Sequence, residues 1–424
     1  MSFDPREAWA LDQDAHDPLA GYRKEFDYPV GRRGEPLTYL CGNSLGLMPT
    51  ATRGMLNQEL DDWSRLAVEG HMEAKRPWFS YHELFRESGA RLVGATPGEV
   101  VMMNSLSVNL QLMMVTFYRP AGPRVKVLIE DAAFPSDRYA VMSHLGARGV
   151  DPDAHLIIAT PRPGELTLRT DDLAALIERH GSELALVLLP GVQYYTGQRL
   201  DLERLTQAAH GVGAIAGFDL AHAAGNVPLA LHDWNADFAV WCSYKYLNGG
   251  PGAVGGCFVH ERHGLDLTIP RFAGWWGNDP GSRFRLHLNE RFVPREGADG
   301  WQISNPPVFS MTPLLASLRL FDGAGMEAIR AKSVRLTGYL EYLIGRLATD
   351  RLRIITPSDP DARGCQLSLL VSGGARSTFD QLRARGVVGD FRQPDVIRLS
   401  PAPLYNTFHE VWRAAHHLSE VLAG

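Results

Sequence analysis

Apolar and polar positions follow two different rhythms along the middle of the chain. Short, almost continuous apolar runs predict buried strands, and the clearest are VKVLIE (125–130), LALVLLP (184–190), AIAGFD (214–219) and FAVWCS (238–243). Between these runs, apolar residues three or four positions apart predict amphipathic helices at about 173–180 and 202–210. Strands that alternate with helices are typical of a mostly parallel sheet covered by helices. We therefore predict an α/β fold.

The regions that flank this sheet differ in texture and indicate further domains. Residues 1–70 combine a short strand, a Gly/Asn/Pro loop and a helical pattern, and we interpret them as an N-terminal arm and helix that pack with a smaller domain. Residues 71–314 then form the large domain. A long helical segment from about Thr312 to Leu347 leads into a small α+β domain, residues 315–424, with strands in RLRIIT, CQLSLLV and DVIRLS.

Composition narrows the partners of the chain. The 424 residues are 45% hydrophobic and 21% charged, as in an ordinary globular protein. A net charge of −6 disfavours nucleic acid and anionic membranes and favours a small-molecule substrate. The four cysteines show no metal-ligand spacing, so we predict no disulfide and no metal site. An acidic N-terminus and the lack of an apolar run of about 20 residues predict a cytoplasmic protein without a membrane segment.

The candidate chemistry begins at Lys245, which follows a predicted strand in ADFAVWCSYKYLNGGPG (236–252). An ammonium group beside apolar residues is costly unless it is paired or used in a reaction. A partly desolvated lysine is a competent amine nucleophile near neutral pH, which favours a Schiff-base role. The alternative is a lysine whose head group simply extends into solvent.

A carboxylate in a matching position upstream favours the chemical role. Asp219 ends the run AIAGFD, and His222 follows three residues later. Pyridoxal 5'-phosphate requires a lysine for its aldehyde and a carboxylate that keeps its ring nitrogen protonated, because the protonated ring is an electron sink. Ligands of parallel sheets bind beyond the carboxyl ends of strands, where Asp219 and Lys245 both fall. The ordered pair therefore predicts pyridoxal 5'-phosphate as the cofactor.

Other segments offer matching groups. The segment NSLS (104–107) before an apolar helix presents amides and hydroxyls for a phosphate, although the motif taken alone favours a plain N-cap at Ser107. In DAAFPSD (131–137), Phe134 is placed to stack on a flat cofactor and Asp137 to meet its polar edge, or the segment is an ordinary capped turn. Arg398 in DVIRLS is a candidate for bidentate capture of a substrate carboxylate, with a surface arginine as the alternative.

Taken together, the chain resembles kynureninase, a pyridoxal-phosphate hydrolase of tryptophan catabolism with the fold of aspartate aminotransferase. The resemblance runs from about Tyr39 to Trp412, which is most of the chain. It rests on the shared order of CGNSLGL, KRPW, NSLSVNL, FPSD, GVQYYTGQ, DLAHAAGN, SYKYLNGGPG, GWWG, ISNPP and RLSPAPLYN.

The resemblance implies a fold type I pyridoxal-phosphate enzyme that acts as a homodimer. It implies cofactor contacts at Leu106, Ser107, Phe134, Pro135, Ser136, Asp137, Asp219, His222, Tyr244 and Lys245. Trp275 and Asn305 are implied to reach the phosphate and substrate region from the second subunit. One position departs from relatives with a polar residue near the cofactor, because Pro190 precedes Gly191 here.

The reaction implied by the resemblance is hydrolysis of L-kynurenine to anthranilate and L-alanine. Lys245 is then the base that removes the Cα proton, and Tyr244 either relays protons or only binds the phosphate. His71 and Asn305 are candidates for holding the carbonyl and aniline groups of the substrate, and Arg398 its carboxylate. The aromatic pocket would be walled by Trp78 and Trp275.

Two other functions are weighed against this one. A cysteine desulfurase has a similar Asp-x-x-His and lysine arrangement, and Cys365 lies downstream of Lys245, where a persulfide cysteine is possible. Yet Cys365 stands at the entry of an apolar strand, which is typical of a small core residue. A non-catalytic pyridoxal-binding protein is the second alternative, and the joint presence of Lys245, Asp219 and Arg398 argues against it.

Overall fold

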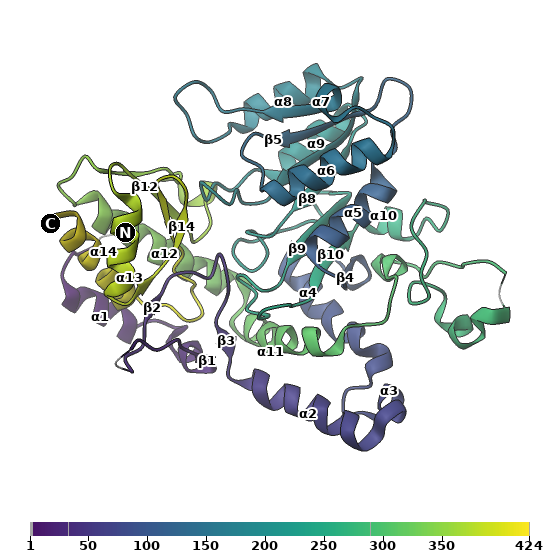
Figure 1. The fold of residues 1–424 in the computed structure, drawn as a ribbon, viewed down its shortest axis with the longest axis horizontal. Helices are drawn as coiled ribbons and strands as arrows, with labels where there is room; N and C mark the ends of the chain where they lie inside the picture. The colour runs from purple at the N-terminus through teal and green to yellow at the C-terminus, as the bar shows by residue number, and fades with distance from the viewer. Residues whose placement is uncertain (1–2, 33, 289, 424) are drawn as a thin grey trace.

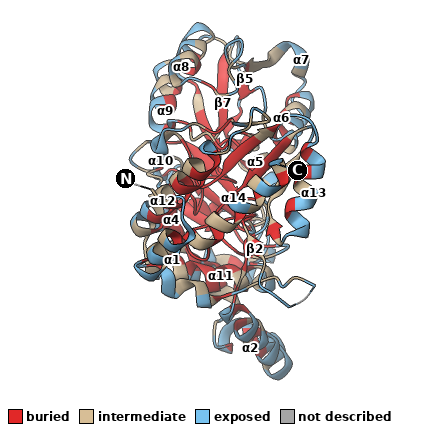
Figure 2. Cartoon of the chain, turned by 90° about the vertical axis from the view of Figure 1, so that its left-hand side faces the viewer, coloured by how far each residue is buried: buried red, intermediate tan, exposed pale blue. Residues whose placement is uncertain are grey.

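The computed structural model describes residues 3–32, 34–288 and 290–423, and Figure 1 shows their arrangement. The strands of these residues gather mainly into a larger sheet in the centre and a smaller sheet near the two chain ends. Buried residues fill the centre of the molecule, whereas the outer faces of the helices are exposed (Figure 2).

Within the described residues, the larger sheet has seven strands. Their order is β4 (Val100–Met102), β10 (Gly255–Val259), β9 (Phe238–Cys242), β8 (Ile215–Asp219), β7 (Leu184–Pro190), β5 (Lys126–Glu130) and β6 (Leu156–Ala159). From β9 to β6 all neighbours are parallel, and β10 is antiparallel to both β9 and β4. The mostly parallel sheet is therefore as predicted, with one reversed strand.

The hydrophobic pattern does not predict the reversed strand β10, because the strand begins with two glycines. A Cβ atom at Gly256 would lie 2.0 Å from the ring of Trp241 on the neighbouring strand. A Cβ atom at Gly255 would lie 3.1 Å from the backbone nitrogen of Leu106. Both side chains are missing for reasons of space, so the usual β-branched signal of a strand is lost.

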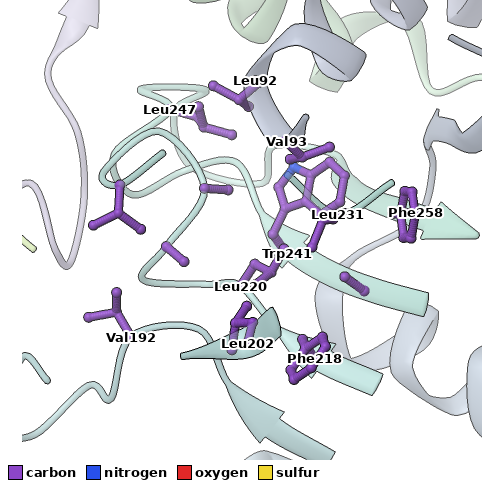
Figure 3. Packing of buried hydrophobic residues seen from close by; sticks show 14 of the residues in the cluster. Leu92, Val93, Val192, Leu202, Phe218, Leu220, Leu231, Trp241, Leu247 and Phe258 are labelled. Atoms are coloured by element: carbon purple, nitrogen blue, oxygen red, sulfur yellow. The ribbon is translucent and has the colours of Figure 1, made fainter. Parts of the chain in front are cut away.

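Alternate residues of the central strands belong to two different cores, one on each face of the sheet. Val127 and Ile129 of β5 join one buried cluster, and Leu128 between them joins the other. Figure 3 shows the second cluster around Trp241, with Phe218 and Phe258 from strands of the same sheet. Helices cover these faces, namely α5 (Leu106–Phe117), α6 (Pro135–Ala147), α8 (Thr170–Arg179) and α9 (Leu202–Gly211).

The smaller sheet is antiparallel and belongs to the C-terminal part of the chain. Its described strands, in order, are β11 (Leu352–Ile354), β12 (Leu367–Val371), β15 (Val396–Leu399) and β14 (Asp390–Arg392). It is accompanied by α13 (Ala375–Ala384) and α14 (Phe408–Ala423). The N-terminal α1 (Glu7–Ala15) packs on α14, and β2 (Thr38–Tyr39) pairs with β13 (Val387–Val388).

The predicted helical segment from Thr312 to Leu347 is two helices. They are α11 (Val308–Ala324) and α12 (Met326–Gly345), and Gly325 between them has a φ of +77°. Glycine adopts this backbone conformation at little cost, which lets the chain turn between the helices. Helix α11 packs on α2 (Ala51–Leu66) and α4 (Arg86–Val93), whereas α12 packs on α14. The predicted domain boundary near 315 thus falls inside α11.

Helix α2 projects from the body of the molecule in both views (Figures 1 and 2), and the short α3 (Gly70–Glu73) lies beside its end in Figure 1. Several large apolar side chains on and after α2 are exposed. They are Leu60, Trp63, Val68 and Met72. An apolar surface on a projecting element is typical of a protein interface.

Asp237 anchors the start of β9 and the end of α9, at the edge of the sheet away from Asp219. Its Oδ2 accepts hydrogen bonds from the Ala216 N–H at 2.7 Å and from His210 Nε2 at 2.8 Å. Its Oδ1 is 2.7 Å from His263 Nε2 and 2.5 Å from Arg262 Nη2. Burial opposes ionisation of Asp237, but these partners hold its pKa well below the usual range.

We expect Asp237→Asn to destabilise the protein by about 1–3 kcal/mol at pH 7, because Arg262 loses its counter-charge and the buried hydrogen bonds lose an anionic acceptor. A carboxyl with a depressed folded-state pKa stabilises the fold above its unfolded-state pKa of about 4, and this contribution fades as the pH falls further. Urea midpoints at fixed protein concentration between pH 7 and pH 3 measure the effect. A difference between wild type and variant that widens on acidification would contradict this account.

Candidate active site

Three chemically active side chains meet beyond the carboxyl ends of three parallel strands of the larger sheet. Glu130 ends β5, Asp219 ends β8, and Lys245 lies three residues after β9. All three line one cavity of about 510 Å³. Lys245 is half-buried, and its Nζ is 3.1 Å from Nε2 of His222. The strand-end rule therefore places the predicted lysine and aspartate in the same space.

Most of the other predicted cofactor contacts line this cavity too. They are Leu106 and Ser107 from α5, Phe134, Ser136 and Asp137 from the turn into α6, and His222 and Tyr244. Pro135 is the first residue of α6 within that turn. The ring of Phe134 has its centroid 5.7 Å from the Lys245 Nζ.

The N-terminus of α5 presents free backbone donors to the cavity. Ser105 is the N-cap residue, and its side chain makes no capping hydrogen bond to the described chain. Ser107 lies inside the first turn, so the simple N-cap considered for it is wrong. The uncapped amides and the positive end of the helix dipole form a site suited to an anion such as phosphate.

His222 is held as a neutral imidazole. Burial first, and then the nearby charge of Lys245, lower its pKa well below the usual value. Its Nδ1 is buried and has no hydrogen-bond partner among the described residues. The neutral ring lines the cavity, and its Nε2 is the nitrogen next to Lys245.

Carboxyl groups crowd the cavity around Asp219. Burial and the charge of Asp219 raise the pKa of Glu130 to about 8. The same two causes, in the same order, raise the pKa of Asp137 well above its usual value. Asp219 itself accepts a hydrogen bond from the Ala221 N–H at 2.6 Å. Such a group of buried acids is short of a cation, and a protonated ring nitrogen beside Asp219 would supply one.

Tyr244 lies at the mouth of the cavity, where 36% of the residue is exposed. Burial of its ring and the neighbouring Cys242 raise the pKa of its hydroxyl above the usual value. The group therefore stays protonated at neutral pH and is able to donate a hydrogen bond or a proton.

The other predicted substrate residues, apart from Arg398, gather in a second cavity. His71, Trp78 and Asn305 line about 1010 Å³ of space together with Trp276. The rings of His71 and Trp78 are perpendicular, with centroids 5.5 Å apart. Trp275 packs edge-on against Trp276 and is 42% exposed. Among the described residues, the linings of the two cavities do not overlap.

Arg398 is fully buried, so the alternative of a surface arginine is wrong. It forms an ion pair with Asp390, and its Nη1 donates a hydrogen bond to the Tyr194 carbonyl at 2.6 Å. Tyr194 lines the first cavity, and the Arg398 Cζ is 6.0 Å from the centroid of its ring. Arg398 therefore contacts a residue of the candidate site without lining the cavity itself.

Comparison with known proteins places the chain in a family. A family model described as the kynureninase C-terminal domain matches residues 329–418. A kynureninase from Myxococcus xanthus (strain DK1622) is 55% identical over 411 residues, which cover 97% of this chain and 96% of the relative. A kynureninase from Koribacter versatilis (strain Ellin345) is 50% identical over 412 residues, 97% of each chain. The chain belongs to the kynureninase family.

Solved structures share the fold of this family member. The cysteine desulfurase CsdA from Escherichia coli matches with a TM-score of 0.77 and 18% identity, over 100% of this chain and 99% of its own. A C-DES mutant with glycine covalently linked to its PLP cofactor matches with a TM-score of 0.75 and 18% identity, over 91% of this chain and 96% of its own. These matches confirm the predicted fold type I architecture.

Cys365, the residue on which the desulfurase alternative depends, is fully buried. Burial raises the pKa of its thiol to about 12, so the reactive thiolate is scarce at neutral pH. It lines a small crevice with Tyr246 and Asn226, and the Lys245 cavity has a different lining in the part of the chain that is described. Its environment is that of a core cysteine in a kynureninase family member.

A Glu/His/His group elsewhere has the composition of a metal site. Glu99, His232 and His260 bring their ligand atoms within 4.8 Å of one another. The Glu99 oxygens that could bind a metal already make hydrogen bonds within the protein. Glu99 accepts hydrogen bonds from the backbone N–H groups of Thr96 and Glu261, and it is 3.0 Å from the His232 Nδ1. We interpret the group as a structural tie near the start of β4.

Some cavity residues were not singled out from the sequence. They are Glu130, Val192, Tyr194 and Ala221. Glu130 carries the signal that identified Asp219, since it also ends a predicted strand, and Tyr194 lies in the quoted block GVQYYTGQ. Pro190 does line the cavity, where its ring offers no hydrogen bond.

No helix among the described residues is long and apolar enough to cross a membrane.

Proposed function

We propose that this chain hydrolyses L-kynurenine to anthranilate and L-alanine and uses pyridoxal 5'-phosphate as its cofactor. The observation that carries the proposal is the meeting of Lys245 and Asp219 in one cavity with the uncapped start of α5. Aldehyde, ring nitrogen and phosphate each find a matching group there. Kynureninase relatives at 50–55% identity over nearly the whole chain support the reaction.

The residues of the cavity fit this cofactor. Lys245 would hold its aldehyde, Asp219 its ring nitrogen, and the α5 amides with Ser107 its phosphate. Phe134 and His222 line the cavity as flat rings for its two faces. When bound, the cofactor supplies an electron sink for the pair left behind by the Cα proton.

The side chains then divide the proton transfers. Lys245, once released from the aldehyde, is the base that takes the Cα proton of the substrate. Asp219 would pair with the ring nitrogen and so favour its protonated form. Tyr244 retains its proton at neutral pH and relays it: the hydroxyl donates to the Cγ carbonyl oxygen and regains a proton from the water that adds there, before the Cβ–Cγ bond breaks. Whether Tyr244 instead only binds the phosphate is decided by Tyr244→Phe, which removes the proton and keeps the ring.

We further propose an obligate homodimer in which the second cavity completes the partner's site. His71, Trp78 and Asn305 would contact the carbonyl, the aniline group and the ring of the substrate. Exposed apolar side chains lie in or beside this cavity, namely Trp63, Phe309 and Trp275. Further exposed apolar side chains on α2, α3 and residues 272–288 are Leu60, Met72, Phe272, Phe284 and Leu288. A second copy of the chain on this surface would bury them and bring the two cavities together.

Subunit mixing tests the shared site. Lys245→Ala and Asn305→Ala are each expected to be inactive as homodimers. If Lys245 and Asn305 of one site come from different subunits, each mixed dimer contains one intact site. Random exchange of equal amounts should then restore roughly a quarter of the wild-type activity.

The matched control is a mixture of Lys245→Ala with Asp219→Asn. These residues line the same cavity of one chain, so every site of that mixed dimer keeps one defect. It should stay inactive. Absence of recovery in the first mixture, with subunit exchange shown by mass spectrometry, would place Asn305 in the same subunit's site as Lys245.

Substrate choice is assigned to His71 and Asn305. A 3-hydroxyl on the substrate needs its own polar partner, and a buried unpaired hydroxyl costs about 1–3 kcal/mol, or roughly tenfold to a hundredfold in kcat/KM. We expect a preference for L-kynurenine over 3-hydroxykynurenine and a changed ratio when both residues are replaced. The two kcat/KM values in wild type and double variant measure it, and an unaltered ratio would move selectivity to other residues.

The desulfurase alternative is tested on the same preparation. The protein loaded with pyridoxal 5'-phosphate is given L-kynurenine or L-cysteine, and anthranilate and sulfide are measured. We expect anthranilate from the first and background sulfide from the second, in wild type and in Cys365→Ala alike. Sulfide release that disappears in Cys365→Ala, without anthranilate formation, would replace the proposed function with desulfuration.

A further inference from the structure

Two arginines and one aspartate share a face of the smaller sheet. Strands β14 and β15 are antiparallel, and their register sets Asp390 directly opposite Arg398. Arg392 follows Asp390 by two residues, so its side chain leaves β14 on the same side. Asp390 forms an ion pair with Arg398, and its Oδ2 is 3.2 Å from the Arg392 Nη2. One carboxylate therefore serves two guanidinium groups.

This face has an excess of positive charge and of hydrogen-bond donors. The Arg398 side chain is fully buried, the Asp390 side chain is 14% exposed and the Arg392 side chain 37%. The Nε atoms of both arginines are buried and have no hydrogen-bond partner within the described chain. Burial lowers the pKa of Arg398 to about 10, which still leaves it charged at neutral pH. A buried charge in excess calls for a further anion.

The face of the smaller sheet that carries Arg392 and Arg398 lies next to Tyr194, a residue of the Lys245 cavity. The Cζ atoms of Arg392 and Arg398 are 5.9 and 6.0 Å from the ring centroid of Tyr194, which lines that cavity. The Tyr194 ring is in turn 6.5 Å from the His222 ring. After burial and Lys245, the charges of both arginines contribute to the low pKa of His222, so their field reaches the cavity.

We infer that Arg392 acts with Arg398 to bind the α-carboxylate of the substrate, and that Asp390 positions both guanidinium groups for it. An α-carboxylate brings the one negative charge and the acceptor oxygens that this face lacks. Arg392 is thereby a further substrate-recognition residue, and the substrate amino acid lies with its carboxylate toward the smaller domain. The inference rests on the proposed function, because that function makes an α-amino acid the ligand.

The test compares two product-like ligands that differ only in the carboxylate. Dissociation constants of L-alanine and L-alaninamide are measured by calorimetry on the protein loaded with pyridoxal 5'-phosphate. Arg392→Gln should weaken L-alanine about 10- to 100-fold and leave L-alaninamide within about twofold, since the amide carries no charge. Arg392→Lys should fall between, as a point charge replaces a planar fork.

Arg353→Gln is the matched control, because Arg353 is an exposed arginine on β11 of the same sheet. It should leave both dissociation constants unchanged. Equal weakening of both ligands by Arg392→Gln would show that Arg392 only supports the fold, and unchanged L-alanine binding would place the carboxylate elsewhere. Should Arg392→Gln not fold, the same comparison is made with Arg392→Lys.

The outcomes separate this inference from the proposed function. Turnover of L-kynurenine without the split between L-alanine and L-alaninamide overturns the inference and leaves the function in place. The split without turnover supports the arginine pair as an amino-acid carboxylate site and removes the reaction.

Discussion

Lys245→Ala should reduce kcat for L-kynurenine by at least ~10³-fold, because the variant loses both the group that holds the cofactor and the base for the Cα proton. Lys245 is the lysine that lines the cavity among the described residues. Borohydride reduction of the loaded protein followed by peptide mass spectrometry gives a second readout. It should find the cofactor attached to the Lys245 peptide in wild type, and no attachment in the variant.

Lys24→Ala is a suitable control, since Lys24 is an exposed lysine near the N-terminus. It should retain wild-type turnover and the same reduced peptide. Turnover of Lys245→Ala close to wild type, or attachment of the cofactor to another lysine in the wild-type protein, would refute the assignment of Lys245.

Asp219→Asn should lower kcat by about 10²- to 10³-fold while the cofactor stays bound. The neutral amide retains an oxygen for the Ala221 N–H, so local structure is preserved. It does not keep the ring nitrogen protonated, and the electron sink is weakened. Cofactor content and kcat are measured on the same sample. A kcat within about twofold of wild type, with full cofactor content, would rule out this role for Asp219.

The sequence predicted the central sheet well because buried parallel strands leave a simple signal. The runs ending at Asp219 and Pro190 are the strands β8 and β7, and the strand-end rule brought Asp219 and Lys245 into one cavity. The short helix-start motif at Leu106 and Ser107 joined them for the same topological reason. Features that depend on local sequence or on strand order could therefore be predicted from the sequence.

Features that depend on tertiary contacts could not be predicted from the sequence. Strand β10 lacks its apolar signal because the Trp241 ring occupies the space above Gly256. The break at Gly325 depends on a single backbone angle inside an otherwise helical pattern. The burial of Arg398 follows from its pairing with Asp390 across two strands, which spacing along one strand does not reveal. His71 and Asn305 line a different cavity from Lys245, and this depends on how distant segments pack, which no local pattern in the sequence reveals.

Carbon–carbon hydrolysis is the central claim, and one labelling experiment tests it most directly. The protein loaded with pyridoxal 5'-phosphate is incubated with L-kynurenine in oxygen-18-labelled water, and both products are quantified by mass spectrometry. The account predicts equal amounts of anthranilate and L-alanine, with one solvent oxygen in each new anthranilate carboxyl group. Consumption of L-kynurenine without L-alanine, or anthranilate that carries no solvent oxygen, would contradict it.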